Sequence, residues 1–179
     1  ELDEQGGLTS YRNNYCSSIM ARDADSGDLI WAYNVTPQDQ WDLDEPSANI
    51  LVDLEIDGRL RKALVRPARN GFFYVFDRET GEPIWPIVEE PVEQSMVPGE
   101  KLAATQPNPT KPAPFDMQGL TEDGLVDFTP EIKRMALEAV AEYQLGGVFN
   151  PPLQRNNPQG KLASIQCPAG AVNITHPSS

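Results

Sequence analysis

The sequence is poor in the residues that most metal and nucleophilic sites use. It has one histidine, His176, and two cysteines, Cys16 and Cys167, in 179 residues. A single histidine excludes a histidine-rich metal cluster and argues against a Ser-His-Asp triad within this chain. The cysteines lack CxxC or CxxH spacing, which argues against structural zinc. They either form a disulfide in an oxidising compartment or remain separate thiols, and separate thiols are the simpler interpretation.

Basic residues and long apolar runs are also scarce. Lysine and arginine number 14 against 27 aspartates and glutamates, so the formal net charge is −13. This charge disfavours nucleic acid and anionic membrane surfaces as partners. No apolar run approaches the roughly 20 residues of a membrane span, so no span is expected in this segment. Residues 1–5 carry no basic region, so either a signal was removed or none existed.

Residues 15–88 are rich in β-formers divided by turn residues, after a polar stretch at 1–14 that we expect to be a loop or frayed end. Alternation and composition predict strands at 15–22, 29–35, 49–54, 61–66 and 71–77. The phrase Asp23–Trp31 returns as Asp77–Trp85, and its turn glycines, Gly27 and Gly81, are 54 positions apart. Short antiparallel strands in such a repeat are typical of β-propeller blades.

The equal spacing of the two copies has a structural explanation that needs no active site. Trp31 and Trp85 are large apolar side chains that we expect to pack between neighbouring blades. The Asp-x-x-[Ser/Thr]-Gly turns are predicted to be hairpin turns and not phosphate sites.

Residues 89–160 differ in character from the repeat. Six prolines predict a long loop over 89–127, which either forms a lid or the edge of a substrate funnel or simply wraps the surface: Pro91, Pro98, Pro107, Pro109, Pro112 and Pro114. Thr129 and Pro130 then predict the start of a helix at about 130–144, with an apolar stripe that we expect to pack on the propeller rim. Residues 161–167 are predicted to be a strand that opens a further, truncated blade within 161–179.

An acidic stretch, Thr36–Asp44, lies between the predicted strands. It places Asp39, Asp42 and Asp44 around Trp41. Carboxylates concentrated between β-hairpins are candidates for proton transfer or metal binding.

Together these segments resemble the quinoprotein dehydrogenases, eight-bladed propellers that hold pyrroloquinoline quinone (PQQ) and a metal ion on the central axis. The Asp-to-Trp phrases resemble the tryptophan-docking motif of that family. Thr36–Asp42 is similar to the stretch that carries its catalytic base, and Arg69–Arg78 to the strand whose leading basic residue approaches the quinone. Residues 105–116 and 127–131 resemble an insertion of the glucose and polyol branch. The fold implied is all-β: about two to three blades of an eight-bladed propeller, with one helix in an insertion between blades.

The resemblance also implies roles for individual residues. Asp42 corresponds to the general base and to a metal ligand, and Asp44 to a further ligand in the lanthanide-using methanol dehydrogenases. Arg69 corresponds to the cation beside the quinone, with Asn70 next to it, and Asn173 to a quinone contact. These roles suit the chemistry, because alcohol oxidation requires a base for the hydroxyl proton while hydride leaves for the quinone.

The implied function is part of a periplasmic dehydrogenase that uses PQQ with Ca²⁺ or a lanthanide ion. Its substrate would be an alcohol, polyol or sugar, with the insertion favouring the latter two, and its electron acceptor cytochrome c or ubiquinone. The family's paired cysteines, its Glu and Asn metal ligands and the Trp beneath the quinone are not found in this sequence. We therefore expect a fragment that is inactive alone. The alternative is a non-catalytic propeller that serves as an interaction scaffold.

Overall fold

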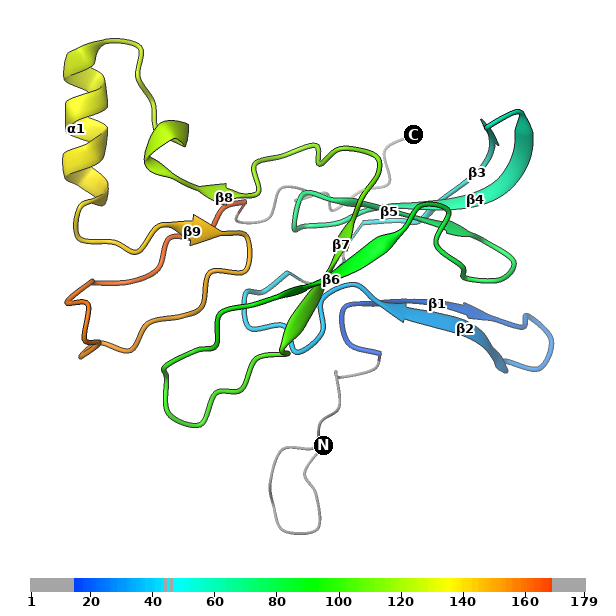
Figure 1. Cartoon of the computed structure of the whole chain (residues 1–179). Coiled ribbons are helices and arrows are strands. Elements are labelled where there is room, and N and C mark those ends of the chain that lie inside the picture. Colours follow the sequence, from blue (N-terminus) through cyan, green and yellow to red (C-terminus); the bar gives the residue numbers. More distant parts are fainter. Residues whose placement is uncertain (1–14, 44, 46, 169–179) are drawn as a thin grey trace.

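The computed structural model describes residues 15–43, 45 and 47–168, and small antiparallel sheets dominate them (Figure 1). The hairpin β1–β2 comes first, a three-stranded sheet β3–β4–β5 follows, and two short two-stranded sheets, β6–β7 and β8–β9, complete the strands. Their bounds are β1 Ser18–Arg22, β2 Leu29–Asn34, β3 Ile50–Ile56, β4 Arg59–Pro67, β5 Phe73–Asp77, β6 Ile87–Pro91, β7 Thr105–Pro109, β8 Gly119–Leu120 and β9 Gly146–Gly147. The predicted hairpins up to residue 77 are confirmed, and the number of blades remains a prediction.

The two copies of the repeated phrase form matching turns. The Asp23 carboxylate accepts hydrogen bonds from the backbone N–H groups two and three residues later, at 3.0 and 2.8 Å. Asp77 does the same at 3.0 and 3.2 Å. Gly27 and Gly81 both have φ of +77°, a conformation that glycine adopts without strain. The acidic residue of each turn therefore satisfies backbone donors, as expected of a hairpin turn.

Trp31 connects the first copy of the phrase to the second. Its ring lies against Gly81, where an added Cβ would approach the ring to 2.6 Å. Its indole N–H donates to the backbone oxygen of Arg78 at 3.2 Å, and its ring centroid is 5.9 Å from that of Phe76. The tryptophan of one repeat thus docks on the turn of the next, as the repeat predicts.

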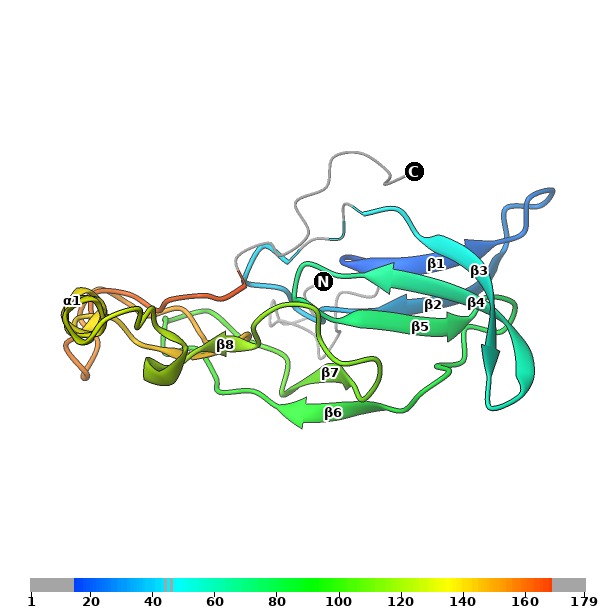
Figure 2. The same ribbon diagram turned by 90° about the horizontal axis from the view of Figure 1, so that it is seen from above.

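The main core lies between the β1–β2 hairpin and the β3–β4–β5 sheet, which are side by side in Figures 1 and 2. Its buried members are Ile19, Trp31, Val35, Leu64, Ala68, Phe72, Tyr74 and Phe76. A second, smaller cluster is formed by Trp41, Leu43 and Leu102. This second cluster anchors the acidic stretch.

The proline-rich segment is not wholly a loop, so that part of the prediction is wrong. Residues 105–109 form β7, which pairs in register with β6 over Ile87↔Pro109 to Pro91↔Thr105. Proline has no N–H, but a two-stranded sheet leaves one side of each strand without ladder bonds, and prolines can lie there. Backbone bonds from Thr110 to Pro86 and from Val92 to Ala104, both 3.0 Å, extend the ladder at its two ends.

The helix α1 (Pro130–Val140) begins as predicted, with the Thr129 hydroxyl accepting from the N–H of Ile132 at 3.2 Å. It ends earlier than predicted, because the N–H of Tyr143 bonds the Val140 oxygen and the next residue, Gln144, pairs with the chain near 163–165. No helix among the described residues is long and apolar enough to cross a membrane.

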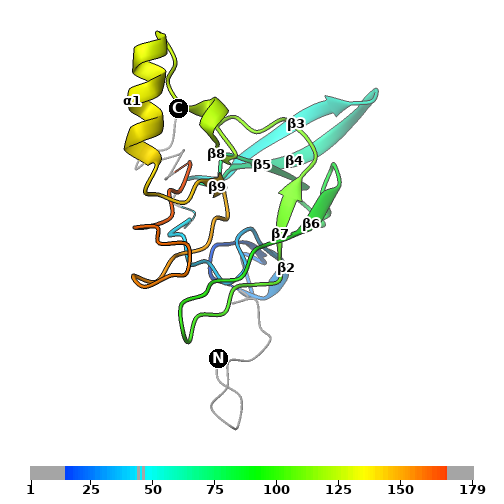
Figure 3. The ribbon, with the colours of Figure 1, turned by 60° about the vertical axis from the view of Figure 1, so that its left-hand side comes forward.

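The helix does not pack on the β1–β5 sheets, which corrects the expected rim contact. None of its residues is buried, and Met135 is exposed. Its Leu137 and Val140 instead line a hollow shared with Leu120 of the same insertion, near the short 3₁₀ helix η1 (Glu122–Gly124). Figures 1 and 3 show α1 at the far end of the insertion, away from β1–β5. The apolar side of α1 therefore faces the short strands β8 and β9 of its own insertion and not β1–β5.

Residues 161–167, which were predicted to be a strand, do not form one. Over the described part of this segment, to residue 168, Ser164 makes one parallel bridge to Gln144. Whether residues 161–179 open a further blade stays a prediction. Cys16 and Cys167 are separate thiols.

The docking of Trp31 on Gly81 predicts different effects for two otherwise equivalent substitutions. Gly81→Ala and Gly27→Ala both place a Cβ at φ +77°, a cost of about 1–2 kcal/mol. At Gly27 nothing lies within 4 Å, whereas at Gly81 the indole must move. We expect Gly81→Ala to lower the free energy of unfolding in urea by about 1–3 kcal/mol more than Gly27→Ala. Equal losses would contradict the docking role of Trp31.

Candidate functional site

Asp42 is held outward by two buried neighbours. Trp41 and Leu43 are buried in the second cluster, while the Asp42 side chain is 91% exposed. The Trp41 indole donates to the backbone oxygen of Asn150 at 2.8 Å and meets the Phe149 ring edge-on at 5.2 Å. Asp42 has φ of +58°, a left-handed conformation that aspartate tolerates better than most residues. The loop therefore presents one carboxylate to the outside by burying the residues on either side.

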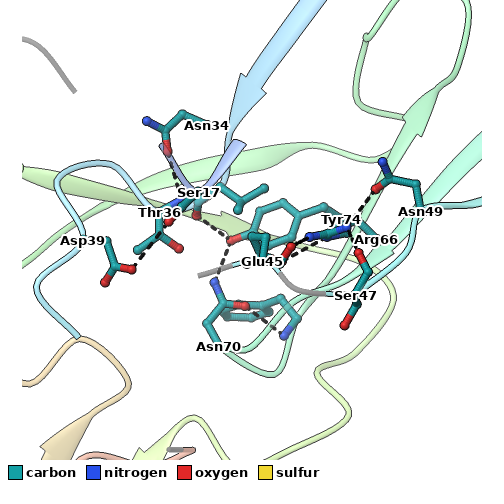
Figure 4. Close-up of polar contacts among 12 residues, drawn as sticks. Ser17, Asn34, Thr36, Asp39, Glu45, Ser47, Asn49, Arg66, Asn70 and Tyr74 are labelled. Atoms are coloured by element: carbon teal, nitrogen blue, oxygen red, sulfur yellow. Dashed lines mark hydrogen bonds and ion pairs between the residues drawn. The ribbon is translucent and has the colours of Figure 1, made fainter. Parts of the chain in front are cut away.

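Asp39 shapes this loop. Its carboxylate accepts from the backbone N–H of Trp41 at 2.8 Å. It also accepts from the Ser17 hydroxyl at 3.5 Å (Figure 4). Burial raises the pKa of Asp39, and the nearby charge of Asp42 adds to that effect. These contacts give Asp39 a part in the geometry around Asp42.

A buried ion pair holds the far end of the loop, and sequence reasoning missed it. The Arg66 Nε lies 3.0 Å from Oε2 of Glu45, with the two side chains only 6% and 4% exposed. The guanidinium also donates to the backbone oxygens of Glu45 and Ser47 and, at 3.2 Å, to Oδ1 of Asn49 (Figure 4). Arg66 stands in β4 among other basic residues, so composition alone does not mark it. The signal is Leu64, two positions earlier on the same face of β4, which is buried in the main core.

Arg69 stands beside Asp42. It belongs to a tight turn closed by backbone bonds from Ala68 to Phe72 (2.9 Å) and from Gly71 to Ala68 (3.0 Å). One terminal nitrogen of Arg69 lies 4.0 Å from Oδ2 of Asp42, and its side chain is 20% exposed. The structure thus brings together two of the residues selected from the sequence, which stand 27 positions apart.

Asn70 has a structural position, which argues against its expected contact with a cofactor. The residue is fully buried; its amide nitrogen donates to the Tyr74 hydroxyl at 3.0 Å, and its amide oxygen accepts from the Phe72 N–H at 3.2 Å. The Tyr74 hydroxyl in turn lies 3.2 Å from the Val35 oxygen and 2.9 Å from the Pro107 oxygen. With no exposed surface, Asn70 holds the turn that carries Arg69.

The insertion contacts both the loop that carries Asp42 and the turn that carries Arg69. The Gln118 amide donates to the backbone oxygen of Asn70 at 2.9 Å, and the Phe115 N–H donates to Gly71 at 2.9 Å. At the other loop, Asn150 receives the indole of Trp41. Of the two roles considered for this segment, these contacts favour an edge of the site over a simple surface wrap.

Asp44 and Asn173, the other two residues selected from the sequence, lie outside the described residues. Within the described part of the chain, no three His, Cys, Asp or Glu residues are grouped so as to hold a metal ion. Asp42 can therefore offer one carboxylate oxygen donor to a hard cation, with the remaining ligands coming from elsewhere. Arg69 beside it suits an anionic, electron-accepting oxygen.

The Glu45–Arg66 pair predicts a large loss of stability when one partner is removed. We expect Arg66→Met to lower the free energy of unfolding by about 3–5 kcal/mol, because it leaves a buried carboxylate without its cation. The double variant Glu45→Gln/Arg66→Met should recover part of that loss. Lys62→Met breaks an exposed pair with Glu79, at 2.7 Å, and should change stability by less than about 1 kcal/mol. Similar losses for Arg66→Met and Lys62→Met would contradict the burial argument.

The raised pKa of Asp39 predicts that the free energy of unfolding depends on pH. Because its pKa is raised in the folded protein, the folded state binds more protons than the unfolded state between the usual pKa of 3.8 and the raised value. The Asp39 contribution therefore favours folding at acid pH and declines as pH rises through that window. Asp39→Asn keeps an oxygen for the Trp41 N–H and should remove this part of the decline in pH-dependent urea unfolding. Asp25→Asn, which removes an exposed carboxylate, should retain it; parallel curves for wild type and Asp39→Asn would contradict the assignment.

Comparison with known proteins shows the family of this chain. A family described as "PQQ: Glucose/ethanol/alcohol dehydrogenase, beta-propeller domain" matches residues 1–175. The quinate/shikimate dehydrogenase (quinone) of Acinetobacter baylyi is 32% identical over 148 residues, which are 82% of this chain and 18% of that protein. The quinoprotein glucose dehydrogenase of Escherichia coli is 31% identical over 156 residues, 84% of this chain and 19% of that protein.

Among solved structures, the quinohemoprotein alcohol dehydrogenase of Comamonas testosteroni is 34% identical, with a TM-score of 0.41, over 59% of this chain and 15% of its own. The chain spans about a fifth of the length of the two curated relatives described above. The family match covers nearly every residue, including the Asp42 loop and the Arg69 turn. The chain therefore belongs to the β-propeller family of PQQ-dependent glucose, ethanol and alcohol dehydrogenases.

Proposed function

We propose that this chain supplies the general base and a quinone-side cation to a PQQ-dependent dehydrogenase that oxidises an alcohol, polyol or sugar hydroxyl. One observation carries the proposal: an exposed carboxylate, Asp42, fixed 4.0 Å from the guanidinium of Arg69. Because its two neighbours are buried, the Asp42 carboxylate points outward and is available to a substrate. The Arg69 guanidinium beside it is available to the group that receives electrons.

The chemistry follows from the two side chains. Asp42 as carboxylate accepts the proton of the substrate hydroxyl, which lets the carbon release a hydride. PQQ, when bound, supplies the acceptor for that hydride. Arg69 would hold the cofactor on its electron-accepting side, where its positive charge would stabilise negative charge. The turn at 68–72 and the buried Trp41 hold the Asp42 carboxylate and the Arg69 guanidinium at a fixed separation. This lowers the entropic cost of the reaction.

A metal ion completes the proposed site. Asp42 would provide one oxygen ligand, and Asp44 would be a second where the ion is a lanthanide instead of Ca²⁺. Asn173 is proposed as a quinone contact. Asn70 is left out of the proposed cofactor contacts because it is buried in this chain.

The substrate class and the electron acceptor are also proposals. Relatives are named for glucose and for quinate or shikimate, which are polyhydroxyl compounds, and the insertion contacts the turn that carries Arg69. These observations favour a sugar or polyol over methanol. Cytochrome c or ubiquinone is the proposed acceptor, and the bacterial periplasm the proposed location. A scaffold without catalysis would not need an exposed carboxylate beside Arg69.

The base assignment predicts the effect of Asp42→Asn in the quinone-loaded dehydrogenase. Asparagine tolerates the same left-handed backbone and removes the proton acceptor, so quinone reduction by substrate should fall by about 10²- to 10⁴-fold. PQQ should remain bound, as measured by its absorption. Asp57→Asn is a matched control, because Asp57 also has positive φ (+52°) in an exposed turn, and it should leave turnover unchanged. Unchanged turnover in Asp42→Asn would refute the assignment.

A further inference from the structure

Two ion pairs join the same two segments of the chain. Oδ2 of Asp42 lies 4.0 Å from a terminal nitrogen of Arg69, and Oε2 of Glu45 lies 3.0 Å from Nε of Arg66. Glu45 follows Asp42 by three residues, and Arg66 precedes Arg69 by three residues. The two segments therefore run in opposite directions, with an ion pair at each end. The Asp42 end is exposed, whereas the Glu45 end is buried.

The segment that carries the two arginines has little freedom to move. Arg66 stands opposite the fully buried Tyr74 in the β4–β5 ladder, so both side chains lie on one face of the sheet. Pro67, with its fixed φ, is the last residue of β4, and Ala68 after it is fully buried. The Arg66 side chain is therefore a fixed reference point for the turn that carries Arg69.

Arg66 binds the backbone of the acidic loop as well as the Glu45 carboxylate. Its guanidinium donates to four acceptors: the Glu45 carboxylate, the backbone oxygens of Glu45 and Ser47, and Oδ1 of Asn49 (Figure 4). The planar fork of an arginine suits several acceptors in fixed positions better than a lysine ammonium does. Arg66 thus attaches the chain that follows Asp42 to β4 over residues 45–49.

This attachment differs in direction from the one that Trp41 makes. Trp41 connects the loop to the insertion, through the Asn150 oxygen and the Phe149 ring. Arg66 connects the loop to the strand that continues into the Arg69 turn. The Asp42–Arg69 contact is too exposed and too long to fix the loop by itself. Trp41 therefore orients the loop relative to the insertion, and Arg66 orients it relative to Arg69.

We infer that Arg66 is a positioning residue for the reaction, which acts through Glu45 and the loop backbone on the separation of Asp42 and Arg69. This inference rests on the proposed function, in which Asp42 accepts the substrate proton and Arg69 faces the electron acceptor. A displacement of about 1 Å, caused by a change away from the reacting atoms, can lower a rate by about 10²-fold. The competing explanation is that the Glu45–Arg66 pair stabilises the fold and has no effect on the reaction.

The test begins with Arg66→Met in the full-length, PQQ-loaded dehydrogenase, with ethanol as substrate. Rates are measured well below the unfolding temperature of each variant and expressed per PQQ-loaded molecule. We expect kcat to fall by about 10- to 100-fold, because the loop is no longer attached to β4. The Kd of PQQ, measured by absorption, and the KM for ethanol should change by less than about threefold, because Arg69 and its turn are retained. A kcat equal to that of wild type would overturn the inference.

Further variants separate positioning from stability, and they apply even if Arg66→Met folds poorly. Glu45→Gln/Arg66→Met removes the buried charge and should recover stability, but it lacks the guanidinium that binds the loop, so kcat should stay low. Arg66→Lys keeps a cation for Glu45 and should restore kcat in part. Lys62→Met, which breaks the exposed pair with Glu79, is the matched control and should leave kcat unchanged. Recovery of kcat together with stability in the double variant would show a purely structural role.

A second measurement needs no turnover. Hydrogen exchange of the backbone amides of residues 40–49, followed by mass spectrometry in the full-length protein without PQQ, reports local opening of the loop. Exchange should be faster than in wild type for Arg66→Met and for the double variant, and unchanged for Lys62→Met. Unchanged exchange in both Arg66 variants would overturn the inference, and an inactive Asp42→Asn would still support the proposed function. Faster exchange together with full turnover in Asp42→Asn would overturn the proposed function and leave the attachment of the loop by Arg66 intact.

Discussion

The Tyr74 hydroxyl is the contact on which the arrangement of the site depends. It is buried on β5 and meets the Val35 oxygen, the Pro107 oxygen and the Asn70 amide at 3.2, 2.9 and 3.0 Å. These partners come from the end of the first hairpin, from β7 and from the turn that carries Arg69. Burial raises the pKa of Tyr74 well above its usual value of 10.0, so the hydroxyl keeps its proton and remains a donor. One polar node in the core thus joins three segments, and the bond from Gln106 of β7 to the Pro37 oxygen adds a second polar contact between two of them.

The strands and turns were predictable from sequence because their causes are local. Turn glycines, alternation in β1–β5 and the Thr129 cap each act within a few residues. β7 was not predicted, since its prolines look like breakers until the partner strand shows which side of each proline carries no ladder bond. The helix stripe had the right period, but its packing partner lay in the same insertion and not on the propeller.

The site was predictable only in part, because local motifs mark some of its residues but do not show which residues come into contact. Asp42 and Arg69 were found through motifs, and the 4.0 Å between them required the fold. Asn70 stands next to Arg69 in sequence yet points into the core, because a tight turn sends neighbouring side chains in opposite directions. Glu45 and Arg66 could not be recognised as a pair, since an ion pair between residues 21 positions apart depends on the register of β4.

The two ion pairs near the acidic loop differ in what they can contribute. Glu45–Arg66 is buried, so it constrains the loop strongly whatever its net effect on stability. Asp42–Arg69 has one exposed partner and a longer separation, so its contribution to stability is small. Asp42 is held in place by the buried residues Trp41 and Leu43 and by the Glu45–Arg66 ion pair. Stability does not require the Asp42 carboxylate itself. The fold positions the Asp42 carboxylate without needing it for stability, so this carboxylate is available for proton transfer. That is the physical basis for proposing Asp42 as the general base.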